Sequence, residues 1–136
     1  MSRLVITGGA RLQGEIGIEG SKNAVLPILA ASLLNAGESV IKNCPRIRDV
    51  EIMISILRKI GCSVKIEDDV IIVNSAGLNE TRIPVELAAE MRSSIIFMGP
   101  MLARCGCVTI SYPGGCVTFR AQIRVRSGSR PGYRAC

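Results

Sequence analysis

The motif Gly20-Ser21-Lys22-Asn23-Ala24 places a lysine and an asparagine at the start of a long apolar run. A lysine supplies a compact positive charge, and the unpaired backbone N–H groups of a helix start favour the same kind of anion. Lys22 and Asn23 therefore predict a phosphate or carboxylate site. Taken alone the motif is weak, because a solvated lysine in the first turn is the commoner situation.

Two further residues have side chains suited to an anionic substrate. Arg92 lies among small residues in Ala88-Ala89-Glu90-Met91-Arg92-Ser93-Ser94. Its guanidinium can bind phosphate or carboxylate through two hydrogen bonds, whereas the alternative is a surface ion pair with Glu90 or another neighbour. Cys116 ends Pro113-Gly114-Gly115-Cys116, whose glycines permit a mobile loop. A thiol there could donate a proton, although most single cysteines are only small apolar residues.

Length and composition indicate a folded domain with an aliphatic core. The chain has 136 residues, 48% of them apolar, with no Trp, two Tyr and two Phe. Such a composition suits packed α/β layers better than an aromatic surface that stacks nucleic-acid bases. No apolar run is long enough to span a bilayer, and the first residues lack signal-peptide character, so we expect a cytoplasmic protein with six free thiols.

The net charge of +6 is unevenly distributed. Residues 117–136 contain five arginines and no acidic residue, which leaves 12 basic against 11 acidic residues in positions 1–116. The alternative function is therefore a basic-tailed module that binds nucleic acid or an anionic surface. Since the basicity is confined to the tail, nucleic acid is not the favoured partner.

Apolar periodicity predicts the elements that would position these side chains. The predicted strands are 4–6, 12–18, 38–42, 64–66, 70–73 and 108–111, of which the first two form a hairpin. The predicted helices are 22–34, capped by Ser21, 49–60, and 84–104, bent or broken at Pro100. In the second helix an apolar stripe of Val50, Met53, Ile54, Leu57 and Ile60 should face the core.

This alternation of strands and helices predicts the α/β class, with helices packed on a sheet and functional residues in loops and at helix starts. The pattern stops after Cys116. Residues 117–136 show no sustained period and mix arginines with glycine and proline, so we expect a disordered basic tail.

Four motifs together resemble the N-terminal part of the UDP-N-acetylglucosamine 1-carboxyvinyltransferases, also called UDP-N-acetylglucosamine enolpyruvyl transferases. They are the helix-start motif, Cys44-Pro45-Arg46-Ile47-Arg48-Asp49-Val50, Met91-Arg92-Ser93-Ser94-Ile95 and Pro113-Gly114-Gly115-Cys116. The resemblance implies an inside-out α/β barrel fold of repeated small strand-helix units, incomplete in this chain. It covers residues 1–116, whereas 117–122 departs from the family pattern; we interpret this as a possible change of reading frame.

The resemblance also implies a transferase that moves the enolpyruvyl group of phosphoenolpyruvate to the 3-hydroxyl of UDP-N-acetylglucosamine and releases phosphate. This is the first committed step of peptidoglycan synthesis. Cys116 is then the proton donor, Lys22 and Asn23 bind phosphoenolpyruvate, and Arg92 binds UDP-N-acetylglucosamine. No metal or other cofactor is expected. Asp49 and Arg48 are less specific, since the aspartate could equally be a helix cap.

The same resemblance has two further implications, one for the activity of this chain alone and one for the choice between related enzymes. Members of the family are about three times as long as this chain, so the 136 residues alone should be inactive. The sister enzymes that act on shikimate phosphate share the fold and the enolpyruvyl donor but do not rely on this cysteine loop, so Cys116 argues against them.

Overall fold

The computed structural model describes residues 3–111 and 122–126. The helical segments are α1 (Lys22–Ala31), the 3₁₀ helix η1 (Ser32–Leu34), α2 (Arg48–Lys59), α3 (Val85–Glu90), the 3₁₀ helix η2 (Arg92–Phe97) and α4 (Met98–Cys105). The strands are β1 (Glu38–Ile41), β2 (Ser63–Glu67), β3 (Val70–Asn74), β4 (Cys107–Ser111) and β5 (Gln122–Arg126).

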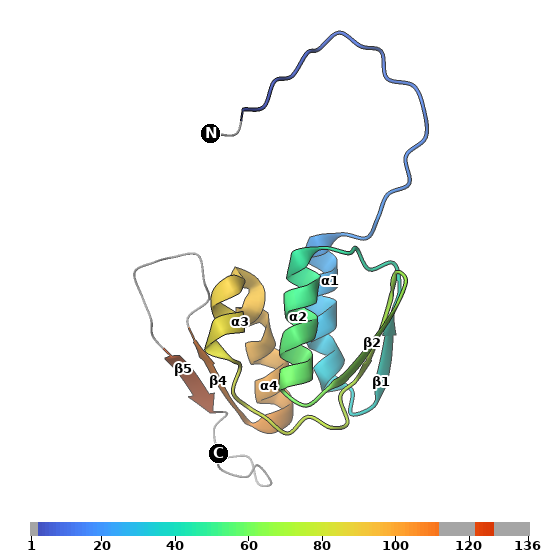
Figure 1. Cartoon of the computed structure of the whole chain (residues 1–136). Helices are drawn as coiled ribbons and strands as arrows, with labels where there is room; N and C mark the ends of the chain where they lie inside the picture. Colours follow the sequence, from blue (N-terminus) through green and yellow to red (C-terminus); the bar gives the residue numbers. More distant parts are fainter. Residues whose placement is uncertain (1–2, 112–121, 127–136) are drawn as a thin grey trace.

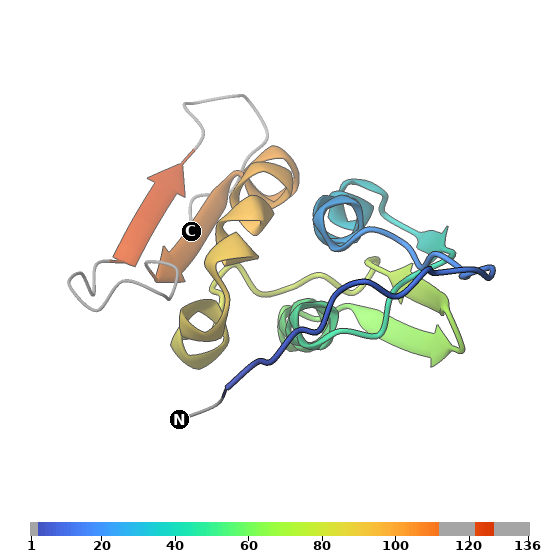
Figure 2. The same ribbon diagram turned by 90° about the horizontal axis from the view of Figure 1, so that it is seen from above.

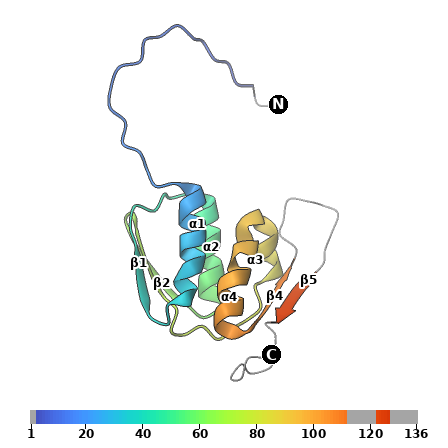
Figure 3. The ribbon, with the colours of Figure 1, turned by 180° about the vertical axis from the view of Figure 1, so that it is seen from behind.

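The helices lie between two small antiparallel sheets (Figures 1 and 2). One sheet has the order β1-β3-β2, and in the other β4 pairs with β5. Residues 81–83 also run beside β4, where the Ile83 amide donates to the Thr109 carbonyl at 3.0 Å. Both α1 and α2 begin at the same end of the molecule (Figures 1 and 3).

The core is aliphatic, as the composition predicts, and side chains of α1, α2 and the η2–α4 region contribute to it. The predicted α2 stripe of Val50, Met53, Ile54, Leu57 and Ile60 is buried throughout. It is joined by apolar side chains of α1, the sheets and the η2–α4 region, mainly Leu29, Leu33, Val73, Phe97, Met101, Val108 and Ile110. The acidic first turn and basic last turn of α2 complement its helix dipole.

Most predicted elements are confirmed within one to three residues, but two helix details differ. Ser21 has the extended backbone of an N-cap, yet its side chain makes no cap hydrogen bond. The third helix ends at Met91, which is buried and extended, and not at Pro100. Pro100 is the third residue of α4, a first-turn position whose N–H has no helical partner in any case.

The predicted hairpin of residues 4–6 and 12–18 is wrong for this structure. Residues 3–18, here called the N-terminal arm, form no strand and extend away from the body (Figures 1 and 3). Their six large aliphatic side chains are between 72% and 92% exposed. Strand alternation is present in the sequence, but a two-stranded hairpin is marginal without an apolar surface beneath it.

We expect removal of residues 1–18 to leave the stability of the body unchanged. Because the arm's large aliphatic side chains are exposed, its loss should shift the thermal midpoint by less than about 2 °C. Circular dichroism melts of both forms would measure this. A fall of more than about 5 °C would show that the arm packs on the body.

Part of the expected disordered tail forms a strand. Gln122–Arg126 is β5, in register with β4 from Cys107 opposite Arg126 to Ser111 opposite Gln122. Its Ile123 and Val125 supply the alternation that the surrounding arginines obscure. The rest of 117–136 lies outside the described residues, and the boundary at 116 stays a prediction. In the described ranges, every helix is too short or too polar to cross a membrane.

Candidate functional site

The starts of α1 and α2 are joined by an ion pair between two residues of the sequence motifs. Lys22, the first residue of α1, places its Nζ 2.6 Å from Asp49 Oδ2 in the first turn of α2. The Lys22 side chain is 53% exposed and the Asp49 side chain 28%. Asn23 follows Lys22 in the same exposed turn. A cation and the free N–H groups of a helix start therefore lie together at this end of the molecule.

A second ion pair joins α2 to the end of α3. Arg48 Nη2 donates to Glu90 Oε2 at 3.0 Å. Arg92, two residues beyond Glu90, is exposed at the start of η2. The predicted alternative of an Arg92–Glu90 pair is not observed, because Glu90 pairs with Arg48. The guanidinium of Arg92 makes no ion pair with the described residues and can still bind an anion.

Gly20 fixes the approach of the chain to α1. A Cβ at this position would lie 2.0 Å from the Asn43 carbonyl oxygen and 3.3 Å from Pro45 Cδ. Glycine is therefore required where the arm meets the loop that leads into α2. This close approach sets where α1 begins and hence where Lys22 and Asn23 lie.

We expect Gly20→Ala to lower the free energy of unfolding by about 2 kcal/mol, because the added methyl group collides with backbone atoms. Urea unfolding followed by circular dichroism would measure the change. Gly37→Ala is the matched control, since a Cβ there would meet only the Asn35 side chain, at an ordinary contact distance of 3.8 Å. Equal effects of the two substitutions would contradict the steric argument.

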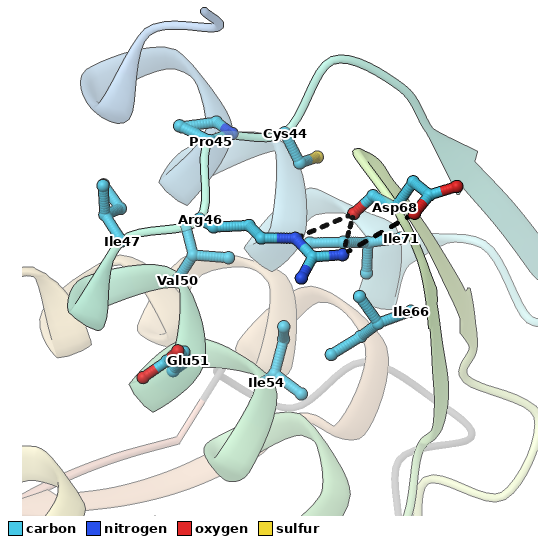
Figure 4. A pocket seen from close by; sticks show the side chains of 10 residues that line it. All are labelled: Cys44, Pro45, Arg46, Ile47, Val50, Glu51, Ile54, Ile66, Asp68 and Ile71. Atoms are coloured by element: carbon cyan, nitrogen blue, oxygen red, sulfur yellow. Dashed lines mark hydrogen bonds and ion pairs between the residues drawn. The ribbon is translucent and has the colours of Figure 1, made fainter.

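Two surface pockets lie beside the ion pairs, and neither contains Lys22, Asn23 or Arg92. One is a cavity of about 110 Å³ between α2 and the β2–β3 hairpin, and four isoleucines are among the ten residues that line it (Figure 4). At its rim the Arg46 guanidinium donates to the Asp68 carbonyl oxygen at 3.1 Å. The other is an open hollow lined by Glu19, Asn43, Cys44, Arg46, Asp68 and Asp69. The first is apolar and the second has excess negative charge, so neither suits an anionic substrate.

The predicted proton donor Cys116 lies outside the described residues. Cys44, Cys62 and Cys105 are free, as expected, but the expectation is wrong for Cys107, which is disulfide-bonded. Burial raises the pKa of the Cys62 thiol to about 11 and raises the pKa of Cys44 and Cys105. These three thiols are therefore poor nucleophiles and poor acids near neutral pH. Within 3–111 and 122–126, no cluster of His, Cys, Asp and Glu side chains could hold a metal ion.

Comparison with known proteins identifies the family. Residues 6–121 match the EPSP synthase (3-phosphoshikimate 1-carboxyvinyltransferase) family. The chain belongs to this family. The matched region includes Lys22, Asn23, Arg92 and Cys116, and it extends slightly beyond the limit expected from the sequence motifs. A solved structure has a similar fold. The enolpyruvyl transferase NikO from Streptomyces tendae superposes on this chain with a TM-score of 0.68 at 23% identity, over 76% of this chain and 24% of that one.

Curated relatives within this family carry a more specific name. The chain is 52% identical over 119 residues to UDP-N-acetylglucosamine 1-carboxyvinyltransferase 1 of Symbiobacterium thermophilum, covering 84% of this chain and 27% of the relative. The corresponding protein of Saccharophagus degradans is 44% identical over 132 residues, or 96% of this chain and 29% of the relative. The chain thus spans under a third of the length of these relatives. The expected fold and the enolpyruvyl transferase resemblance are confirmed.

The sequence alone is consistent with Asp49 as either a helix cap or a site residue. It is not the cap, because the N-cap of α2 is Ile47 and Asp49 is the second residue of the helix. The structure shows it paired with Lys22 from a different helix. The only signal in the sequence was its place in the motif after Cys44-Pro45, and nothing there identifies its partner. The contact depends on how α1 and α2 pack.

Proposed function

We propose that this chain supplies the phosphoenolpyruvate-binding and proton-donating part of a UDP-N-acetylglucosamine 1-carboxyvinyltransferase. The observation that carries the proposal is Lys22 at a helix start, in a chain 52% identical to a relative of that name. The reaction would transfer the enolpyruvyl group of phosphoenolpyruvate to the sugar 3-hydroxyl and release phosphate. As the resemblance implies, this step belongs to peptidoglycan synthesis in the cytoplasm.

Charge and position support separate roles for the residues. Lys22 and Asn23 would hold the phosphate and carboxylate of phosphoenolpyruvate, where the ammonium group and the α1 N–H groups attract negative charge. Arg92, exposed at the start of η2, would bind UDP-N-acetylglucosamine through hydrogen bonds to its oxygens. Cys116 would give its proton to the methylene carbon of phosphoenolpyruvate, so that the adjacent carbon accepts the attacking sugar oxygen.

The rest of the pocket would come from the part of the relatives' length that this chain does not span. Lys22, Asn23 and Arg92 lie on an exposed end of the helices and in neither pocket. A reaction of this kind needs water excluded around the developing charge. We therefore expect activity from the complete enzyme and none from the 136 residues alone.

A chimera tests the function directly. Residues 1–116 of this chain would replace the matching part of the Symbiobacterium thermophilum relative, with the unaltered relative as the positive control. Phosphate release from phosphoenolpyruvate should require UDP-N-acetylglucosamine and should not occur with shikimate 3-phosphate. A folded chimera that releases no phosphate, while the relative is active, would overturn the proposal.

A further inference from the structure

We propose that Asp49 is a positioning residue that holds the Lys22 ammonium group in the orientation needed to bind phosphoenolpyruvate. The contact itself is independent of the reaction, whereas its catalytic consequence rests on the proposed function. Asp49 would touch Lys22 and not the substrate.

The geometry of the pair supports orientation more than stability. Lys22 Nζ and Asp49 Oδ2 are 2.6 Å apart, which is close for a charge-assisted hydrogen bond. An ion pair this exposed contributes little to folding. A lysine side chain has many accessible rotamers, so an unheld Lys22 would have to be ordered each time an anion binds. Its partner removes much of that cost beforehand.

Asp49 is itself held firmly in place. The next residue, Val50, is buried in the core, and its amide donates to the Ile47 carbonyl at 3.0 Å at the start of α2. Asp49 therefore projects from a helical turn that is anchored in the core by the residue next to it, and Lys22 gains a partner on a neighbouring helix.

The competing explanation is that Asp49 only complements the positive end of the α2 dipole. Glu51 separates the two explanations, because it carries the same charge in the same turn. The structure gives Glu51 no ion pair with Lys22. Glu51→Gln thus removes a first-turn charge and leaves the Lys22 contact intact, which makes it the matched control for Asp49→Asn.

The first experiment needs no activity. In the 136-residue chain labelled with ¹³C-lysine, the two Hε protons of a held Lys22 should give separate NMR signals. Asp49→Asn should merge them, whereas Glu51→Gln should not. Circular dichroism would confirm that both variants stay folded. Merged signals in the unaltered chain, or separate signals in Asp49→Asn, would overturn the positioning role.

The second experiment uses the chimera and a double-mutant cycle. Asp49→Asn should lower kcat/KM for phosphoenolpyruvate about 30-fold, with Asp49→Glu recovering part of it and Glu51→Gln changing it less than about twofold. In a Lys22→Ala background, Asp49→Asn should have almost no further effect, because it acts through Lys22. Equal losses in both backgrounds would overturn the proposal. An inactive chimera that passes the NMR test would count against the proposed function alone.

Discussion

Replacing Lys22 with alanine in the chimera should lower kcat/KM for phosphoenolpyruvate by about a thousandfold. Lys22 is the cation at the start of α1, and an anion there would lose both its charge partner and the alignment with the helix N–H groups. Losing one preorganised group that faces developing charge typically costs about 10² to 10³ in rate. Steady-state kinetics with phosphate detection would measure the loss.

The control is Lys59→Ala, which removes the same side chain from the last turn of α2, at the opposite end of that helix. Its kcat/KM should change less than about threefold, because any effect comes only through long-range screened charge. Stability should be nearly equal in the two variants, since both lysines are exposed. If Lys22→Ala kept activity close to that of Lys59→Ala, Lys22 would not bind the substrate.

Helices with a buried stripe were the elements that the sequence predicted best. The stripe of α2 repeats every three or four residues, which only one face of a helix can satisfy, and Gly61, with its left-handed backbone, follows the C-terminal end. The β2–β3 hairpin was predicted correctly because two β-branched runs flank Asp68-Asp69, and Asp68 takes the left-handed backbone that such a turn needs. These features are set by neighbours along the chain.

The errors concern features that depend on distant partners. The arm has strand alternation, but a strand forms only when a second strand and an apolar surface are available. β5 pairs with β4, and the alternation of Ile123 and Val125 is too short to predict a strand without that partner. The break at Met91 likewise follows from burying that side chain in the core.

The site was predicted in part. Residue type and position placed Lys22 and Asn23 at a helix start, and they lie in the exposed first turn of α1. Arg92 was predicted inside the helix 84–104, whereas it lies exposed at the start of η2. The Lys22–Asp49 and Arg48–Glu90 ion pairs could not be predicted from the sequence, because each joins two helices whose packing no local sequence pattern determines. Cys116 remains a prediction from the sequence.

Arg104 forms several hydrogen bonds from one guanidinium near the C-terminal end of α1, the end of that helix opposite Lys22. Its Nη1 donates to the Leu33 carbonyl at 2.7 Å and to the Asn35 carbonyl at 3.3 Å, and its Nη2 donates to the Ser75 carbonyl at 2.8 Å. It also bonds the hydroxyl of Ser75, a fully buried residue that in turn donates to Asn35. One side chain in the last turn of α4 therefore satisfies carbonyl groups in η1, directly after η1 and directly after β3.

Arg104→Ala should lower the free energy of unfolding by about 3 kcal/mol, the largest stability loss that we expect for a single polar side chain here. Buried carbonyls at Leu33 and Ser75 would lose their donor, and each such group costs about 1 to 3 kcal/mol. Urea unfolding would measure the change. Arg58→Ala removes only one bond, to the Val64 carbonyl at 2.9 Å, and should cost about 1 kcal/mol. Arg104→Lys should fall between the two, because it keeps the charge without the fork of donors. A loss at Arg104 no greater than at Arg58 would mean that water satisfies these carbonyls.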